Sequence, residues 1–120
     1  MNLPPELAAK CLELAGLTTA PTPIVDEGAT EKQFQADVIR EARRAGWRVY
    51  HAFNSNRSTP GFPDLVLVRD RVIFAELKTA TGKLTSEQDD WIQALRGAGI
   101  TAVVWRPVDW PAIMDTLSKP

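Results

Sequence analysis

The chain has 120 residues, 44% hydrophobic and 24% charged, which suits one hydrophobic core and is too short for two. Its net charge of −1 argues against indiscriminate coating of nucleic acid, which needs many Lys and Arg contacts to phosphate. With no apolar run of membrane-spanning length and no signal-peptide pattern, we expect a cytoplasmic protein that does not bind membranes. A single cysteine and a single histidine exclude an internal disulfide and a Cys/His zinc cluster, so any metal must be held mainly by oxygen atoms.

The first 29 residues are predicted to be an accessory piece, separate from the main body. Residues 4–16 start with two prolines and end on a glycine, which favours a short helix. Residues 17–29 are rich in Thr and Pro without an apolar period, which is typical of a linker. The main body is therefore expected to span residues 30–120.

The main body is predicted to open with a helix that starts after Thr30. The segment Thr30–Gln33 fits a capping box, in which the Thr side chain accepts from the Gln33 backbone and the Gln33 side chain reaches back. Gly46 is expected to end the helix. Apolar residues recur at helical spacing between these points: Phe34, Val38, Ile39, Ala42 and Ala45.

Three strands are predicted next. Residues 47–53 alternate large and β-prone side chains, and residues 54–61 are a loop rich in Asn, Ser, Thr, Pro and Gly. Two apolar, β-branched runs at 64–68 and 72–78 flank the charged residues 69–71, which predicts an antiparallel hairpin.

A second helix is predicted over residues 86–97, because Thr85 and Gln88 fit another capping box and apolar residues follow at helical spacing. A further strand is expected over 100–105, and Asp109 can cap a last short helix. The order α-β-β-β-α-β-α predicts a mixed α/β domain with a central sheet.

One strand departs from the apolar pattern of the others. Glu76 and Lys78 end an otherwise apolar strand, and both lie on the same face of it. The hairpin can bring the carboxylate of Asp64 beside Glu76. Two carboxylates held together favour a cation between them, and Mg²⁺ prefers oxygen ligands, with the carbonyl of Leu77 as a further candidate ligand. Lys78 could stabilise negative charge or help to orient and deprotonate a nucleophile. This division of roles is what metal-dependent phosphodiester hydrolysis requires.

The motifs in this region resemble those of the virus-type replication-repair nuclease (VRR-NUC) domain of the PD-(D/E)XK superfamily. The resemblance rests on Gly61-Phe62-Pro63-Asp64-Leu65, Glu76-Leu77-Lys78, the segment from Gly82 to Trp91, and Ala98-Gly99, and covers residues 30 to about 106. It implies a restriction-endonuclease-like fold with a central mixed β-sheet flanked by helices. It also implies metal binding by Asp64 and Glu76 and a catalytic role for Lys78, with Mg²⁺ as cofactor and Mn²⁺ able to substitute.

Two further residues match positions that contribute to the site in such nucleases. Glu31 shares the inward helix face of Phe34 and Val38, although an acidic residue in a first turn also complements the helix dipole. Gln88 falls on the inward face of its helix and could hydrogen-bond a metal water or Lys78. Its place in the capping box explains it equally well, and the sequence does not separate the two roles.

Residues 31–60 hold six basic and three acidic side chains, a local balance of +3, which suggests a nucleic-acid contact surface or simply a solvated helix face. The loop at 54–61 is expected to run along the nucleic acid. The candidate contact residues are Arg40, Arg43, Arg44, Arg48, Ser55, Arg57, Ser58 and Lys83.

The resemblance further implies a DNA endonuclease that acts as a homodimer on branched DNA, such as a Holliday junction, in repair, recombination or phage replication. A small body with one metal site is consistent with this, because symmetric cutting of two strands needs two sites related by a twofold axis. Trp105, Trp110 and Ile113 are candidates for an interface patch, with packing into the core as the alternative.

The sequence disfavours two other classes of protein. A nucleophilic hydrolase is disfavoured because the lone histidine, His51, has no partnering Ser or Cys motif and fits a partly buried strand residue better. A catalytically inactive nucleic-acid-binding or assembly module of the same fold is the main alternative. The presence of all four expected site residues argues against it.

Overall fold

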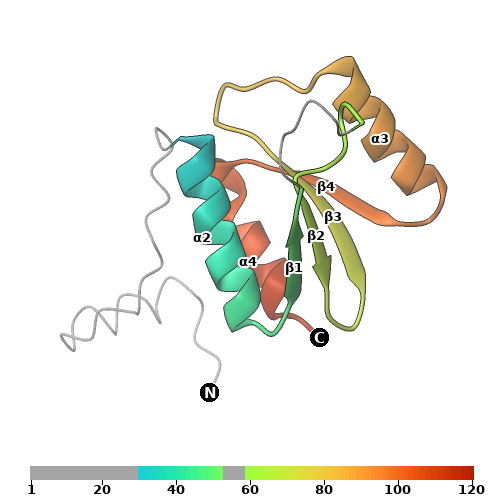
Figure 1. Ribbon diagram of the computed structural model, residues 1–120. Helices are drawn as coiled ribbons and strands as arrows, with labels where there is room; N and C mark the ends of the chain where they lie inside the picture. The colour runs from blue at the N-terminus through green and yellow to red at the C-terminus, as the bar shows by residue number, and fades with distance from the viewer. Residues whose placement is uncertain (1–29, 53–58) are drawn as a thin grey trace, which may run out of the picture.

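The computed structural model describes residues 30–52 and 59–120 (Figure 1). The predicted order of helices and strands is confirmed, with one added 3-10 turn before the last helix. The elements are α2 (Glu31–Arg44), β1 (Arg48–His51), β2 (Leu65–Val68), β3 (Val72–Leu77), α3 (Ser86–Gly97), β4 (Thr101–Trp105), η1 (Pro107–Asp109) and α4 (Trp110–Ser118). The predicted helix at 4–16 and the linker at 17–29 lie outside the described residues.

The strands form one mixed sheet in the order β1-β2-β3-β4. The predicted hairpin is confirmed, since β2 and β3 pair antiparallel with Leu65 opposite Ala75 and Val68 opposite Val72. β1 also pairs antiparallel with β2, whereas β4 runs parallel to β3. The parallel pair requires a long crossover, which α3 supplies.

One face of the sheet carries the main hydrophobic core, where α2 and α4 pack side by side (Figure 1). Alternate strand residues point into this core and meet the apolar stripes of the two helices. Its members include Leu65, Leu67, Ile73, Ala75 and Leu77 from the strands, Phe34, Val38 and Ala42 from α2, and Leu117 from α4.

The predicted interface patch of Trp105, Trp110 and Ile113 is wrong, because all three are core residues that are at most 5% exposed. Ile113 and Trp110 lie on the inward face of α4, and Trp105 shares the core face of the sheet with Leu77. Packing therefore accounts for these side chains, and none of them is available to a partner.

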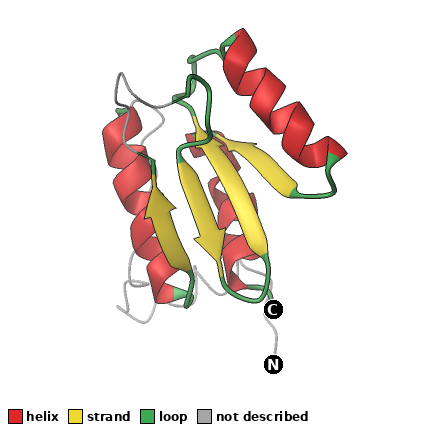
Figure 2. Cartoon of the chain, turned by 45° about the vertical axis from the view of Figure 1, so that its right-hand side comes forward, coloured by secondary structure: helices red, strands yellow, loops and turns green. Residues whose placement is uncertain are grey.

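α3 lies on the other face of the sheet and packs against β4 (Figure 2). An aromatic cluster fills the space beneath it, since the ring centroid of Phe62 lies 5.9 Å from that of Phe74 and 5.2 Å from that of Trp91. No helix that the structure describes is long and apolar enough to cross a membrane.

The helix caps follow the sequence in part. Thr30 Oγ1 accepts from the backbone of Gln33 at 3.1 Å, but the Gln33 side chain donates forward to Asp37 instead of reaching back. The box at the start of α3 is complete. Asp109 stands at the N-cap of α4, yet its carboxylate accepts from the backbone N–H of Arg106 and does not cap the helix.

Two arginines of the β2–β3 turn close the carboxyl end of α4. Arg69 donates to the carbonyl of Leu117 at 3.1 Å, and Arg71 donates to that of Thr116 at 2.8 Å. Both guanidinium groups lie over the ring of Trp47, at 4.6 and 4.9 Å from its centroid, and Trp47 Nε1 also donates to Leu117. Carbonyls left open at a helix end are thus paired by side chains from a distant turn.

Candidate active site

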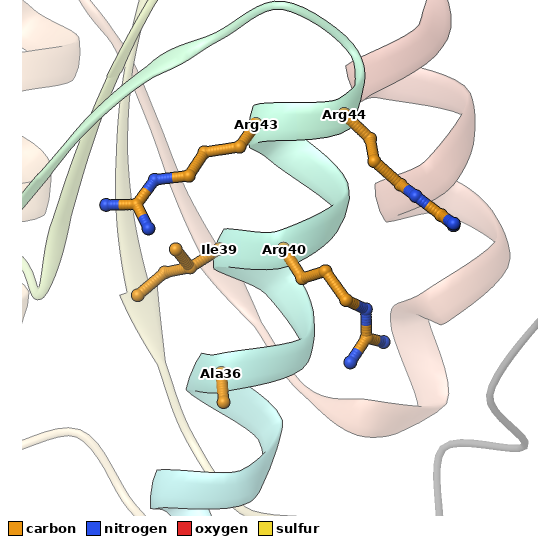
Figure 3. A pocket seen from close by; sticks show the side chains of 5 residues that line it. All are labelled: Ala36, Ile39, Arg40, Arg43 and Arg44. Atoms are coloured by element: carbon orange, nitrogen blue, oxygen red, sulfur yellow. The ribbon is translucent and has the colours of Figure 1, made fainter.

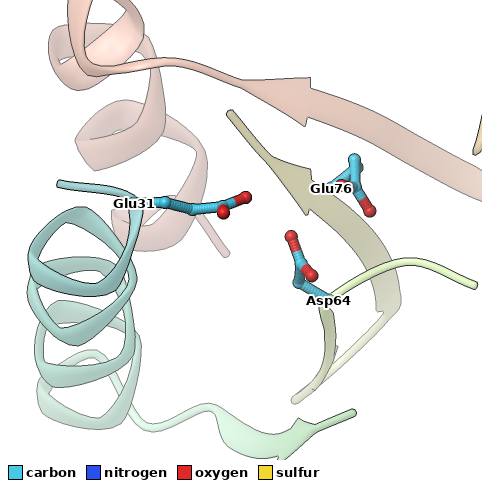
Figure 4. Close-up of side chains that lie close together, drawn as sticks. All are labelled: Glu31, Asp64 and Glu76. Atoms are coloured by element: carbon cyan, nitrogen blue, oxygen red, sulfur yellow. The ribbon is translucent and has the colours of Figure 1, made fainter. Parts of the chain in front are cut away.

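Three carboxylates from separate elements converge at one end of the sheet. Glu31 comes from the first turn of α2, Asp64 directly precedes β2, and Glu76 lies near the end of β3 (Figure 4). One oxygen of each lies within 4.8 Å of the others. Continuing the β2–β3 register by one step sets Asp64 opposite Glu76 on the same face, which explains why the hairpin joins them. All three residues are among those predicted for the site from the sequence.

The Asp64 carboxylate is held in place by the strand it faces. The backbone N–H of Leu77 donates to Asp64 Oδ2 at 2.9 Å. In an extended strand the N–H and C=O of one residue point to the same side, so the Leu77 carbonyl is directed toward this side of β3 as well. The geometry is consistent with Leu77 as a further oxygen ligand.

The turn before Asp64 is fixed by its fit against α3. Gly61 has a φ of +89°, and a Cβ built on it would come within 2.4 to 2.8 Å of the backbone of Glu87 and Gln88. Only glycine combines this backbone conformation with this close approach. Pro63 is fully buried, and its ring restricts the backbone where the chain enters β2.

Glu76 is 1% exposed and its two oxygens have different surroundings. Oε2 accepts from Gln88 Nε2 at 3.1 Å and lies 3.5 Å from the ammonium of Lys78. Oε1 is buried and has no hydrogen-bond partner among the described residues. Burial and the negative charge of Asp64 raise the pKa of Glu76 from 4.5 to about 8, against the opposing effect of Lys78.

These features fit a divalent cation. A buried carboxylate oxygen without a partner is costly, and a second carboxylate nearby adds repulsion. A cation bound between Glu31, Asp64 and Glu76 would remove both costs, and oxygen-only ligands are the set that Mg²⁺ and Mn²⁺ accept.

Lys78 is positioned by backbone contacts on both sides. Its N–H donates to the carbonyl of Trp105 at 2.9 Å, which extends the β3–β4 ladder past Leu77. The turn that follows is held by Arg106, which donates to the carbonyls of Thr79 and Gly82 at 2.7 and 2.6 Å. This role of Arg106 was not predicted, because nothing near it in the chain indicates that it reaches Gly82, 24 residues away.

The two roles left open for Gln88 are compatible. Its Oε1 accepts from the backbone N–H of Thr85 at 2.9 Å, which completes the capping box. Its Nε2 donates at the same time to Glu76. The side chain therefore contacts a candidate metal ligand, where the sequence analysis expected a metal water or Lys78.

The predicted nucleic-acid contacts differ in their availability. Arg40 forms an ion pair with Asp37 at 3.1 Å, and Arg44 pairs with Glu41 at 3.4 Å. Arg43 has no ion pair within the described ranges, and its side chain points away from those of Arg40 and Arg44 (Figure 3). The three arginines line a shallow, open groove on α2 together with Ala36 and Ile39. The exposed residues Arg48 and Lys83 likewise have no ion pair there, whereas Ser55, Arg57 and Ser58 lie outside the described residues.

A mixed sheet with flanking helices, an antiparallel hairpin, a parallel fourth strand and carboxylates at the open end of the hairpin fits an α/β nuclease fold. The chain matches the family model of the VRR-NUC domain over residues 6–109, so it belongs to the VRR-NUC family. Its domain is therefore of a nuclease type, with DNA as the implied substrate. The match includes most of residues 1–29, and the division of the chain at residue 29 stays a prediction.

Two solved structures are similar in fold. One, titled "VRR_NUC domain protein", has a TM-score of 0.62 at 22% identity, covering 75% of this chain and 86% of that one. Another, titled "VRR_NUC domain", has a TM-score of 0.60 at 23% identity, covering 72% and 97%. No curated protein matches the chain.

Proposed function

We propose that the chain is a Mg²⁺-dependent, structure-specific DNA endonuclease, with Mn²⁺ able to substitute. The observation that carries this is the convergence of Glu31, Asp64 and Glu76 within 4.8 Å, with the Lys78 ammonium 3.5 Å from Glu76. Acidic ligands beside a half-buried cationic side chain supply the charges that phosphodiester hydrolysis requires.

In this proposal Asp64, Glu76 and the Leu77 carbonyl hold the cation, with Glu31 completing the acidic set. The bound cation would polarise the phosphoryl group and promote ionisation of water. Lys78 would stabilise the negative charge that develops on the phosphate. Gln88 would hold Glu76 through Oε2, which leaves Oε1 free for the cation.

The first experiment is a cleavage assay with Mg²⁺, Mn²⁺ or EDTA. Asp64→Asn and Lys78→Met should each lower the cleavage rate by about 10²-fold or more, the loss typical of one removed transition-state group. Glu87→Gln, which removes an exposed carboxylate outside the cluster, is the matched control and should retain activity. Full cleavage in EDTA would contradict the proposal, and binding of DNA without cleavage would support the inactive-module alternative.

We also propose that the active species is a homodimer that resolves branched DNA such as a Holliday junction. The small size of the body supports this, since one site cuts one strand and symmetric cutting needs a second copy. The interface must use residues other than Trp105, Trp110 and Ile113, which are buried. Light scattering together with a panel of junction, flap, single-stranded and duplex DNA tests this. A monomer that cuts linear duplex as readily as junctions would contradict it.

A further inference from the structure

The sheet face opposite α2 and α4 is covered unevenly. α3 and the Phe62 ring cover β3 and β4, whereas no described helix lies over the same face of β1 (Figure 2). Along β1, Val49 points into the core, so its neighbours Arg48 and Tyr50 point to the open face. Tyr50 is 65% exposed, the highest value among the exposed large hydrophobic side chains of the described residues.

Tyr50 lies close to the acidic site, opposite Val66, which is two residues along the chain from Asp64. The strand register pairs Tyr50 with Val66 and Val66 with Phe74, and the next residues on that face are Asp64 and Glu76. The pairing continues past β1, since the Ala52 N–H donates to the Asp64 carbonyl at 2.8 Å. With about 3.3 Å per residue and about 4.8 Å between strands, the Cα atoms of Tyr50 and Asp64 lie about 8 Å apart.

An exposed aromatic ring on a sheet surface beside a phosphodiester-cleaving site suits a nucleobase. Aromatic side chains on open sheets stack with bases that are free of a duplex, and the contact tolerates any base. Nucleotides along a stacked strand are spaced about 3.4 Å apart, so about 8 Å corresponds to roughly two nucleotides. Arg48, exposed on the same face and without an ion pair in the described part of the chain, lies beyond Tyr50 where the strand's next phosphates would pass.

We propose that Tyr50 is a stacking site for an unpaired base of the substrate strand, about two nucleotides from the cleaved phosphodiester. This inference rests on the proposed function and names the feature of branched DNA that the site recognises. A base inside a duplex must be unstacked before it can reach the ring, whereas a base in a flap or an opened branch point is already free. The site therefore discriminates by base pairing and not by sequence.

The test uses DNA carrying 2-aminopurine, a base analogue whose fluorescence is quenched by stacking. The analogue is placed in the unpaired nucleotides beside the branch of a flap and, for comparison, inside a linear duplex. Binding is measured with Mg²⁺ in a Lys78→Met background, which prevents cleavage. The Tyr50 variants are Tyr50→Thr, which keeps a β-prone residue without a ring, and Tyr50→Phe and Tyr50→Trp, which keep a ring. Val108→Thr, at a residue 63% exposed in η1, is the control.

We expect Tyr50→Thr to abolish a change in flap fluorescence that Tyr50→Phe and Tyr50→Trp preserve. Its affinity for flap DNA should fall about 5- to 100-fold, with less than about a 2-fold change for duplex. Unchanged fluorescence in Tyr50→Thr, or equal losses on flap and duplex, would overturn the inference. The proposed function fails separately, if the chain with Lys78 and Tyr50 intact shows no metal-dependent cleavage.

Discussion

Replacing Glu76 with Gln should stabilise the metal-free protein at neutral pH. Burial and the charge of Asp64 raise the pKa of Glu76 from 4.5 to about 8 in the folded chain, whereas in the unfolded chain it titrates near 4.5. Between these values the unfolded state gives up a proton that the folded state keeps. The free energy of unfolding therefore falls as the pH rises from about 4.5 to about 8.

The size of this fall follows from the shift. Each pKa unit corresponds to about 1.4 kcal/mol, so the shift sets an upper limit of roughly 5 kcal/mol, and an effect of about 2 to 4 kcal/mol allows for relaxation around the charge. A glutamine removes the titration and retains the shape. Its carbonyl can accept from Gln88 while its NH₂ takes the place of the unpartnered Oε1 beside Asp64.

The assay is urea unfolding in EDTA at several pH values from 5 to 8. The unsubstituted chain should lose stability over this range, and Glu76→Gln should lose much less. Glu87→Gln is the control, because hydrogen bonds to the backbone, Ser86 and Thr85 lower the pKa of this exposed carboxyl, so its titration is displaced away from the pH range of the assay. Saturating Mg²⁺ should reduce the fall in the unsubstituted chain, because the cation binds the ionised form. Parallel pH profiles for the unsubstituted chain and Glu76→Gln would refute the reasoning.

Three more predictions concern the turn before Asp64, the turn after Lys78 and the arginines of α2. Gly61→Ala should cost about 2 to 4 kcal/mol of unfolding free energy, because of the positive φ and the contact with the α3 backbone, and an unchanged urea midpoint would contradict this. Arg106→Gln should lower kcat by about 10-fold with little change in KM or in Mg²⁺ affinity, because it removes the hydrogen bonds that hold the turn after Lys78. Arg106→Lys should restore part of the activity. A change in KM alone would argue against a positioning role for Arg106. Arg43→Ala should lower the salt dependence of DNA binding by about 1 in slope, more than Arg40→Ala, because the guanidinium of Arg40 is already paired with Asp37. A larger loss for Arg40→Ala would contradict this role of the pairing, and unchanged slopes for both variants would exclude α2 as a phosphate-contacting surface.

The sequence predicted those parts of the fold that depend on local pattern. Helical spacing located α2 and α3 to within a residue or two, and the apolar runs around residues 69–71 located the hairpin. The pairing of Asp64 with Glu76 followed from that hairpin, because a tight turn fixes which residues face each other. The Asp64–Glu76 pair was therefore predictable from local pattern, whereas Glu31, which comes from α2, was predicted from the family resemblance and its place on the inward helix face.

What the sequence missed has two causes, which are competing partners within the same helix and tertiary packing. Gln33 was expected to reach back to Thr30, but Asp37 one turn ahead offers a competing acceptor. Arg40 and Arg44 were predicted to contact nucleic acid, but in the helix each forms an ion pair with the acidic residue three positions before it. Trp105 and Trp110 were candidates for an interface patch because no short segment of the sequence shows how α4 packs against the sheet.

The arginine closure of α4 also bears on the order in which the chain folds. A local cap can form together with its helix, but the partners of Thr116 and Leu117 lie 45 and 48 residues earlier, in Arg71 and Arg69. Closing loops of this length costs chain entropy, so we expect the arginine contacts to the last turn of α4 to form only after the hairpin is in place. We expect the same contacts to oppose fraying of the helix end during unfolding, as long as Arg69 and Arg71 stay bonded to its carbonyls. Slow amide exchange at this terminus would accordingly report on the integrity of the whole core.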